Sequence, residues 1–561
     1  MKANGAEIVI KTLISHGVTD IFGYPGGCVL NIYDEIYKAG ESLNHILTCH
    51  EQGASHVADG YARATGKTGV VIATSGPGAT NLVTGIASAY LDSTPLVAIT
   101  GNVDSKLIGK DSFQEVDIAG ITMPVTKHNY IVKDVNELEE TLCEAFRIAR
   151  SGRKGPVLID IPKDVQAASC EFHGGLPLPL YDNPVPDDTE IEKITELVKS
   201  SERPFIYVGG GVVSAEAEEI LAEFAELIDA PAGFSMMGLS AMDYKNPRKL
   251  GMTGMHGVYA ASVVQSEADL IIGVGVRFSD RATGNIGKYT ENAKVIHIDI
   301  DRAEIGKNVA PDLSAVGEIK ETLTRIVAKL KAENFKQTLT SWNERVTELV
   351  TKQQKLFDGS NRNPGDFTPR KIIKAVREYT EDNTPVATDV GQHQMWTAMN
   401  YDFGAPRTFI TSGGLGTMGF GLGAAMGAAV GTGKRAVLIT GDGGFHMNMN
   451  ELATAVTYKI PVVIVIINNG VLGLVRQWQR QFYGERFSNT TLHRKTDYVK
   501  LADAFGAVGF LVKNEAELRN ALDKAFEVND GPVVIDCHID MDEKVLPMIP
   551  PGGSIHDLII K

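Results

Sequence analysis

The amino-acid sequence predicts an α/β protein of three domains, each built as a parallel sheet flanked by helices. Its 561 residues exceed what one hydrophobic core usually organises, which favours three or four domains. Apolar runs rich in Val, Ile and Leu recur along the chain, followed by Gly-rich turns and helical segments of small residues. Such runs are typical of strands buried in parallel sheets with helices on both faces.

Two distant segments of the chain repeat one another. VVIATSGPGATNLVTGIASAYLDSTPLVAITG begins at Val70, and AVLITGDGGFHMNMNELATAVTYKIPVVIVIINN begins at Ala436. The segments 74–95 and 440–461 share a Thr-to-Pro spacing of 21 residues. Unrelated α/β units could converge on such a pattern, but the shared spacing favours a duplicated domain.

The repeat places one domain at residues 1–170 and a related domain at residues 365–550. A third domain, at residues 190–340, follows the Pro-rich stretch 177–186 and leads into a charged helical linker around 320–358. We therefore expect two copies of one fold on either side of a different α/β domain.

The composition disfavours several classes of function. The formal net charge of −15 argues against nucleic acid or an anionic membrane as a partner, because clustered Lys and Arg hold such partners. The longest apolar run, 460–467, is far shorter than the ~18 residues of a membrane-spanning helix. Residues 1–13 resemble an amphipathic helix more than a secretory signal, and the five cysteines contain no Cys-x-x-Cys pair. We expect a cytoplasmic protein.

The strongest local motif is GDGG at residues 441–444, with a pair of asparagines at residues 468–469. Each follows an apolar strand, and ligands of open parallel sheets lie at the carboxyl ends of strands. Asp442 and Asn469 offer the oxygen ligands that Mg²⁺ takes together with phosphate and water. The ion would also offset the repulsion between a carboxylate and a diphosphate. A helix cap and a turn are the alternative, which two motifs at equivalent strand ends disfavour.

Three further motifs are ambiguous by themselves. Glu51 falls in the first turn of a predicted helix, where the helix dipole alone favours an acid. The triplet Gly-Lys-Thr at 66–68 is no phosphate loop, because Tyr61 stands where that motif needs Gly. The glycines 209–211 follow the strand 204–208 and continue as Gly-x-Gly-x-x-Ser, which suits nucleotide binding or a tight turn equally.

Longer motifs extend over nearly the whole chain. They are GYPGGCVLNIYD at Gly23, HEQGASHVADGYARATG at His50, TSGPGATN at Thr74, FQE at Phe113, TKHN at Thr126, GMHG at Gly254, RFSDR at Arg277, IHIDID at Ile296, GQHQMW at Gly391, SGGLGTMGFGL at Ser412, GDGGFHMNMNELATA at Gly441, VRQWQ at Val475 and LPMIPPGGS at Leu546. With them the chain resembles the catalytic large subunit of acetolactate synthase, also called acetohydroxyacid synthase, a thiamine diphosphate-dependent family. Few other thiamine diphosphate enzymes share GMHG, RFSDR and RQWQ.

The resemblance implies the groups that hold thiamine diphosphate. Glu51 would hydrogen-bond the aminopyrimidine in an apolar pocket and favour the imino tautomer that removes the thiazolium proton. Gln114 and Lys127 would be further catalytic groups of the channel. The other implied contacts are Gln392 and His393 toward the diphosphate, the apolar wedge Met418, and Pro25, Gly391, Gly416, Gly441, Asp442, Gly443, Gly444 and Asn469. Magnesium would be held by Asp442, Asn469 and Val471.

The resemblance also implies a flavin (FAD) without a net redox task in the central domain. Its contacts would be Gly209, Gly210, Gly211, Met255, His256, Arg277 and Asp299. The chain departs from the family pattern at Met123, where Arg is usual and contacts the flavin, and at Ser279, where Asp is usual.

The substrate groups that the resemblance implies are Phe113, Arg277 and Trp478. Arg277 would hold the carboxylate of the acceptor, and Trp478 would favour 2-ketobutyrate over pyruvate. A surface ion pair for the arginine and a core position for the tryptophan are the alternatives.

The implied reaction is a step of branched-chain amino-acid biosynthesis. Pyruvate is decarboxylated on the cofactor, and the hydroxyethyl carbanion passes to a second pyruvate or to 2-ketobutyrate, giving 2-acetolactate or 2-aceto-2-hydroxybutyrate. In the family Glu51 and Asp442 of different subunits would hold one cofactor, so we expect a homodimer or tetramer with interfacial active sites. A small regulatory subunit is also implied.

Three other functions compete with this one. Another flavin-containing thiamine diphosphate enzyme, such as pyruvate oxidase, is the nearest; glyoxylate carboligase has an apolar residue in place of Glu51. A nicotinamide oxidoreductase would use the turn at Gly209, which lacks the full fingerprint. A catalytically silent binding protein is disfavoured by the intact Glu51, Asp442 and Asn469.

Overall fold

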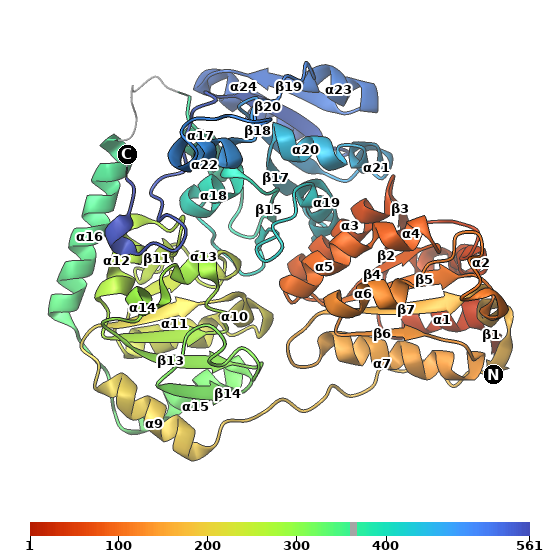
Figure 1. Cartoon of the computed structure of the whole chain (residues 1–561), viewed down its shortest axis with the longest axis horizontal. Coiled ribbons are helices and arrows are strands. Elements are labelled where there is room, and N and C mark those ends of the chain that lie inside the picture. The colour runs from red at the N-terminus through yellow and green to blue at the C-terminus, as the bar shows by residue number, and fades with distance from the viewer. Residues whose placement is uncertain (360–366, 561) are drawn as a thin grey trace.

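The computed structural model describes residues 1–359 and 367–560 (Figure 1). Within these residues lie three six-stranded sheets and a small antiparallel sheet of β1 (Lys2–Asn4) and β8 (Ser169–Glu171). The large sheets are parallel and flanked by helices, which confirms the predicted α/β class. The domain limits stay predictions, and the predicted start of the last domain at residue 365 lies outside the described residues.

The N-terminal and C-terminal sheets have the same topology. The N-terminal sheet runs β3-β2-β4-β5-β7-β6, from β2 (Asp20–Tyr24), β3 (Asn44–Leu47), β4 (Gly69–Ala73), β5 (Leu96–Asn102), β6 (His128–Ile131) and β7 (Pro156–Pro162). The C-terminal sheet runs β16-β15-β17-β18-β20-β19, from β15 (Val386–Thr388), β16 (Phe409–Ile410), β17 (Ala436–Gly441), β18 (Val462–Asn468), β19 (Val508–Val512) and β20 (Val533–His538). Counted from its own first strand, each order is 2-1-3-4-6-5, as expected of a duplicated domain.

The central sheet differs from both. It runs β11-β10-β9-β12-β13-β14, from β9 (Pro204–Val208), β10 (Ala232–Phe234), β11 (Lys249–Met252), β12 (Leu270–Val274), β13 (Lys294–Asp299) and β14 (Leu313–Val316). Counted from β9, this is 3-2-1-4-5-6, the order of doubly wound dinucleotide-binding folds. In such folds the ligand crosses the sheet where the order reverses, at the carboxyl ends of β9 and β12.

Helices cover the faces of the three sheets (Figure 1). The longer helices are α1 (Gly5–Ser15), α2 (Leu30–Ala39), α3 (Glu51–Thr65), α5 (Val83–Leu91), α7 (Leu138–Arg150), α9 (Asp188–Lys199), α11 (Glu218–Leu227), α12 (Tyr259–Glu267), α15 (Ile319–Ala332), α16 (Thr340–Gly359), α17 (Pro369–Glu378), α18 (Gln392–Asn400), α19 (Phe420–Thr432), α22 (Gly473–Phe482), α23 (Tyr498–Phe505) and α24 (Glu515–Glu527). None of the helices in the described part of the chain combines the length and the apolar character that a membrane crossing needs.

Two helices join the N-terminal domain to the C-terminal domain. In α3 and α19, a Cβ at Gly60 would lie 2.1 Å from the Ala424 carbonyl oxygen, and one at Gly427 would lie 1.9 Å from that of Val57. Only glycine allows two helix backbones to approach so closely. This packing fixes Glu51, the first residue of α3, relative to the C-terminal domain.

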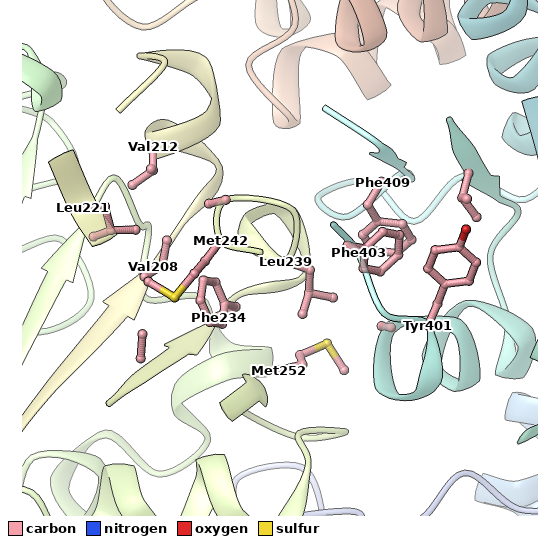
Figure 2. Packing of buried hydrophobic residues seen from close by; sticks show 14 of the residues in the cluster. Val208, Val212, Leu221, Phe234, Leu239, Met242, Met252, Tyr401, Phe403 and Phe409 are labelled. Carbon is pink, nitrogen blue, oxygen red and sulfur yellow. The ribbon is translucent and has the colours of Figure 1, made fainter. Parts of the chain in front are cut away.

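The central and C-terminal domains share one hydrophobic core. Figure 2 shows Phe234 and Met242 on the central side of this core and Tyr401, Phe403 and Phe409 on the C-terminal side. All five side chains are buried. Since burial of each such side chain contributes roughly 1.5–3 kcal/mol, the interface between these domains is stabilised as a domain core would be.

Candidate active site

A large cavity lies where the three domains meet. Its volume is about 810 Å³, and its walls include residues 91–93 of the N-terminal domain, 209–211 of the central domain and 412–416 of the C-terminal domain. The first of these segments braces the last, because the Asp92 carboxylate accepts hydrogen bonds from the backbone N–H groups of Gly413 (3.1 Å) and Gly414 (2.7 Å). Asp92 is paired in turn with the buried Arg63.

The predicted magnesium ligands lie together at the carboxyl ends of β17 and β18. Asp442 begins the short helix α20 (Asp442–Asn448), and the backbone N–H of Asn469 lies close enough to its carboxylate to favour the charged form. The Asn469 amide oxygen accepts the backbone N–H of Val471 at 3.2 Å. Burial raises the pKa of Asp442 to about 6. A bound cation would stabilise the charged form of this carboxylate and offset the cost of its burial.

The neighbouring Gln392 and His393 differ in whether their side chains have a polar atom available for a ligand. Gln392 is committed to the protein, since its amide donates to Gln477 (3.1 Å) and to the Glu543 carbonyl and accepts from Asn469 (3.1 Å). Among the described residues nothing hydrogen-bonds the buried Nε2 of His393. Burial lowers the pKa of His393 to about 4, so the imidazole is neutral near pH 7. His393 therefore has a polar atom available for a ligand.

The other predicted cofactor residues of this domain border the same strand ends. Gly391 has φ of +154° and Gly416 has φ of +71°, backbone conformations that favour glycine. The half-buried Met418 lies beside the GDGG turn, where a Cβ at Gly443 would be 3.8 Å from its terminal methyl. Gly416 also lines the large cavity.

Glu51 lies at the carboxyl edge of the N-terminal sheet, half-buried at the start of α3. Its Oε2 accepts a hydrogen bond from the Asn81 side chain at 2.9 Å. Pro25 follows β2 at the same edge and is also half-buried. In the described chain no hydrogen bond or ion pair joins Glu51 to Asp442.

The predicted channel residues Gln114 and Lys127 and the predicted substrate residue Phe113 lie outside the wall of the large cavity. Phe113 is 87% exposed, and Gln114 adopts φ of +60° with its backbone against Gly76. The Lys127 amine donates to the carbonyls of Ile148 and Ser151 (2.7 Å), and so caps the carboxyl end of α7. Burial lowers the pKa of Lys127 to about 8. A catalytic role for Lys127 would require its amine to leave these carbonyls.

All seven predicted flavin contacts line the cavity: Gly209, Gly210, Gly211, Met255, His256, Arg277 and Asp299. Asp299 ends β13, and burial raises its pKa to about 6. Glycine at 209 has a structural cause, since a Cβ there would lie 1.9 Å from the Gly275 carbonyl oxygen. The loops after β9 and β12 thus touch at the point where the strand order reverses.

The two departures from the family pattern lie in different places. Ser279 lines the cavity, whereas Met123 is 68% exposed in a 3-10 helix and lies outside the cavity wall.

Arg281 also lines the cavity, although no role of its own is predicted for it from the sequence. Its guanidinium lies 5.5 Å from the centre of the Trp478 ring, a cation–π distance. Both residues line the cavity, and the buried Nε1 of Trp478 has no partner among the described residues. Arg281 is the last residue of the RFSDR motif, and Arg277 is the first. The sequence alone does not indicate which of these two arginines would bind the acceptor carboxylate.

Comparison with known proteins defines the class. Models of thiamine pyrophosphate enzymes match the chain as the N-terminal TPP binding domain over residues 3–121, the central domain over 191–326 and the C-terminal TPP binding domain over 389–537. The fold and this match make the chain a thiamine pyrophosphate enzyme of three domains.

Full-length relatives narrow the class further. The acetolactate synthase large subunit of Haemophilus influenzae is 45% identical over 567 residues, which cover 100% of this chain and 98% of the relative. A probable acetolactate synthase large subunit of Methanocaldococcus jannaschii is 46% identical (99% and 95%), and the isozyme 3 large subunit of Escherichia coli is 41% identical (99% and 98%). The chain belongs to the acetolactate synthase large-subunit family, as its motifs predict.

Proposed function

We propose that this chain decarboxylates pyruvate and joins the two-carbon fragment to a second 2-keto acid, pyruvate or 2-ketobutyrate. The observation that carries the proposal is the cluster of Asp442, Asn469 and Val471 at the strand ends of a thiamine pyrophosphate-binding domain. When bound, thiamine diphosphate supplies an electron sink that accepts the electron pair of the carbon–carbon bond broken when pyruvate loses carbon dioxide.

The donor atoms present suit magnesium bound together with a diphosphate. Within residues 1–359 and 367–560, no three His, Cys, Asp or Glu side chains form a metal-binding group. Asp442 and the amide of Asn469 would therefore be joined by phosphate oxygens and water, which is how Mg²⁺ is usually held. The Val471 carbonyl would be the third protein ligand.

Glu51 would hold the proton that the cofactor exchanges. Its Oε2 is oriented by Asn81, which leaves Oε1 for a ligand. Orientation by a fixed neighbour lowers the entropy cost of reaching the reactive geometry.

Arg281 and Trp478 would select the acceptor. A guanidinium binds a carboxylate through parallel charge-assisted hydrogen bonds, and the guanidinium of Arg281 lies 5.5 Å from the ring of Trp478, which would contact the acceptor's alkyl group. We therefore assign the acceptor carboxylate to Arg281, with Arg277 among the flavin contacts.

FAD would occupy the central part of the cavity without changing its redox state overall. The strand order of the central sheet and the seven lining residues support a dinucleotide there. The Nδ1 of His256, which has no partner within residues 1–359 and 367–560, and the buried carboxylate of Asp299 offer polar contacts.

A homodimer or tetramer would complete the active site. Exposed apolar side chains gather on the loops of the N-terminal domain that carry Phe113 and Met123, 87% and 68% exposed in one chain. A second chain would bury them and bring its own Asp442 to the cofactor held by Glu51. A small regulatory subunit fits the large-subunit names of the relatives. Five unpaired cysteines fit a cytoplasmic location.

The product decides between this function and pyruvate oxidase. The chain should be incubated with pyruvate, thiamine diphosphate and Mg²⁺, with and without FAD. Acetolactate as the product, without hydrogen peroxide, supports the proposal. Peroxide formed in step with pyruvate consumption would instead indicate an oxidase with redox-active flavin.

Replacing Trp478 with Leu is expected to lower the preference for 2-ketobutyrate over pyruvate about tenfold, because the larger acceptor loses its apolar contact. Decarboxylation should persist. The ratio of the two products formed in mixtures of both acceptors measures the change. Phe482→Leu is the matched control, since that ring packs edge-on against Trp478 at 5.8 Å but lies outside the cavity wall. An unchanged ratio in Trp478→Leu would refute the assignment.

A further inference from the structure

Glu451 is a buried residue of the C-terminal domain whose carboxylate is hydrogen-bonded to the N-terminal domain. It is the first residue of α21 (Glu451–Thr457) in the C-terminal domain, and its exposed fraction is 0%. Its Oε1 accepts the backbone N–H of His50 at 3.0 Å, and its Oε2 accepts that of Cys49 at 3.1 Å. The proton-handling machinery described above does not use this residue.

These two N–H groups immediately precede Glu51. His50 is the N-cap of α3 and Glu51 is its first residue, so the Glu451 carboxylate fixes the turn from which Glu51 projects. A carboxylate is stabilised there by the positive end of the helix dipole. The hydroxyl of Thr454 also donates to Oε2 at 2.7 Å. Both oxygens are therefore held, and the carboxylate has one well-defined position.

Gly53 makes this contact possible. A Cβ at Gly53 would lie 2.2 Å from Oε1 of Glu451, closer than two non-bonded atoms can approach. Glycine in the first turn of α3 costs about 1 kcal/mol relative to alanine. The glycine at position 53 therefore leaves the space that the Glu451 carboxylate needs to reach the backbone of Cys49 and His50.

We propose that Glu451 is a positioning residue, which acts on the reaction by holding Glu51 in place; the proposal rests on the function proposed for Glu51. The carboxylate sets the turn at Cys49 and His50, and that turn sets where Oε1 of Glu51 meets its ligand. A displacement of about 1 Å at a reacting group can cost on the order of 100-fold in rate. A plain interdomain anchor would stabilise the fold without acting through Glu51.

Glu451→Gln tests the proposal. The glutamine side chain has the shape of glutamate but only one acceptor oxygen, whereas the N–H groups of Cys49 and His50 each bond to a separate oxygen of Glu451. The first readout is the exchange of the C2 hydrogen of bound thiamine diphosphate in deuterium oxide, stopped by acid and measured by NMR. We expect exchange to slow by about 10- to 100-fold. The dissociation constant of thiamine diphosphate, followed by tryptophan fluorescence, should change less than about threefold, since Asp442 and Asn469 are untouched.

The double variant Glu51→Gln/Glu451→Gln separates positioning from anchoring. If Glu451 acts through Glu51, the double variant exchanges no more slowly than Glu51→Gln alone. Multiplied losses in the double variant, or wild-type exchange in Glu451→Gln, would overturn the proposal. If Glu51→Gln itself exchanged at the wild-type rate, the function proposed for Glu51 would fail first, and this inference would fall with it.

Two further variants guard against a folding defect. Gly53→Ala keeps the Glu451 carboxylate but pushes it out of position, so exchange in this variant should also be slow despite the better helix propensity of alanine. Asp229→Asn is the matched control, because Asp229 is a buried acid that accepts the backbone N–H of Leu339 and pairs with Arg248 in the central domain. It should lower the free energy of unfolding and leave exchange within about twofold of wild type. Slow exchange in Asp229→Asn would show that any buried acid gives the effect and would overturn the proposal.

Discussion

Glu51→Gln is expected to lower kcat by about 10²- to 10⁴-fold, the range attributed to a positioned general acid or base. Glutamine has the shape of glutamate, and its carbonyl can still accept the hydrogen bond from Asn81. It cannot exchange a proton with a ligand near neutral pH. The loss should therefore appear in turnover, measured by steady-state acetolactate formation, while the affinity for thiamine diphosphate stays within a few fold.

An acid distant from the strand ends provides the control for this variant. Glu41 is an exposed carboxylate in a 3-10 turn of the same domain, and Glu41→Gln should keep wild-type kcat. Turnover of Glu51→Gln close to the wild-type rate would refute the role assigned to Glu51, whatever the affinity of the cofactor.

Asp442→Asn is expected to weaken binding of thiamine diphosphate at fixed Mg²⁺ by about 100-fold or more. Loss of a group that only supports a metal ligand already costs about 10- to 100-fold in metal affinity, and here the charged ligand itself is lost. Asparagine keeps the shape of the side chain and one carbonyl oxygen, so the turn should persist. Calorimetric titration of the cofactor at several Mg²⁺ concentrations measures the effect.

The Mg²⁺ dependence shows where the loss arises. Because Asp442→Asn weakens the binding of Mg²⁺, a higher Mg²⁺ concentration should restore part of the cofactor binding. Equal cofactor affinity in the variant and the wild type at every Mg²⁺ concentration would contradict the assignment of Asp442 to the metal.

Much of the fold could be predicted because parallel sheets leave a clear trace in sequence. The continuous apolar strands and the 21-residue spacing of 74–95 and 440–461 predicted a duplicated domain, and both sheets have one topology. The order of the central sheet could not be predicted. Strand order depends on which edges pair, and the apolar character of a strand does not specify its neighbour in the sheet.

The site residues that directly follow strands could be predicted from the sequence. Asp442 and Asn469 are predicted from their places after two strands, and the structure puts them at the ends of the paired strands β17 and β18. Lys127 shows the opposite case, because the direction of a long side chain is set by its tertiary neighbours, here two carbonyls at the end of α7. Glu451 gave no signal either, since its partners at residues 49 and 50 are some 400 positions away in the chain.

In the proposed dimer, Glu51 of one chain and Asp442 of the other hold the same cofactor. Glu51→Gln and Asp442→Asn chains, each with little activity alone at low thiamine diphosphate and Mg²⁺ concentrations, can be coexpressed with different affinity tags, and the mixed dimers can be purified and assayed. If each site uses both chains, a mixed dimer has one intact site and one doubly altered site. We predict that it regains about half of the wild-type activity per dimer. Mixed dimers as inactive as the two parents would contradict the claim and place Glu51 and Asp442 at one cofactor within a single chain.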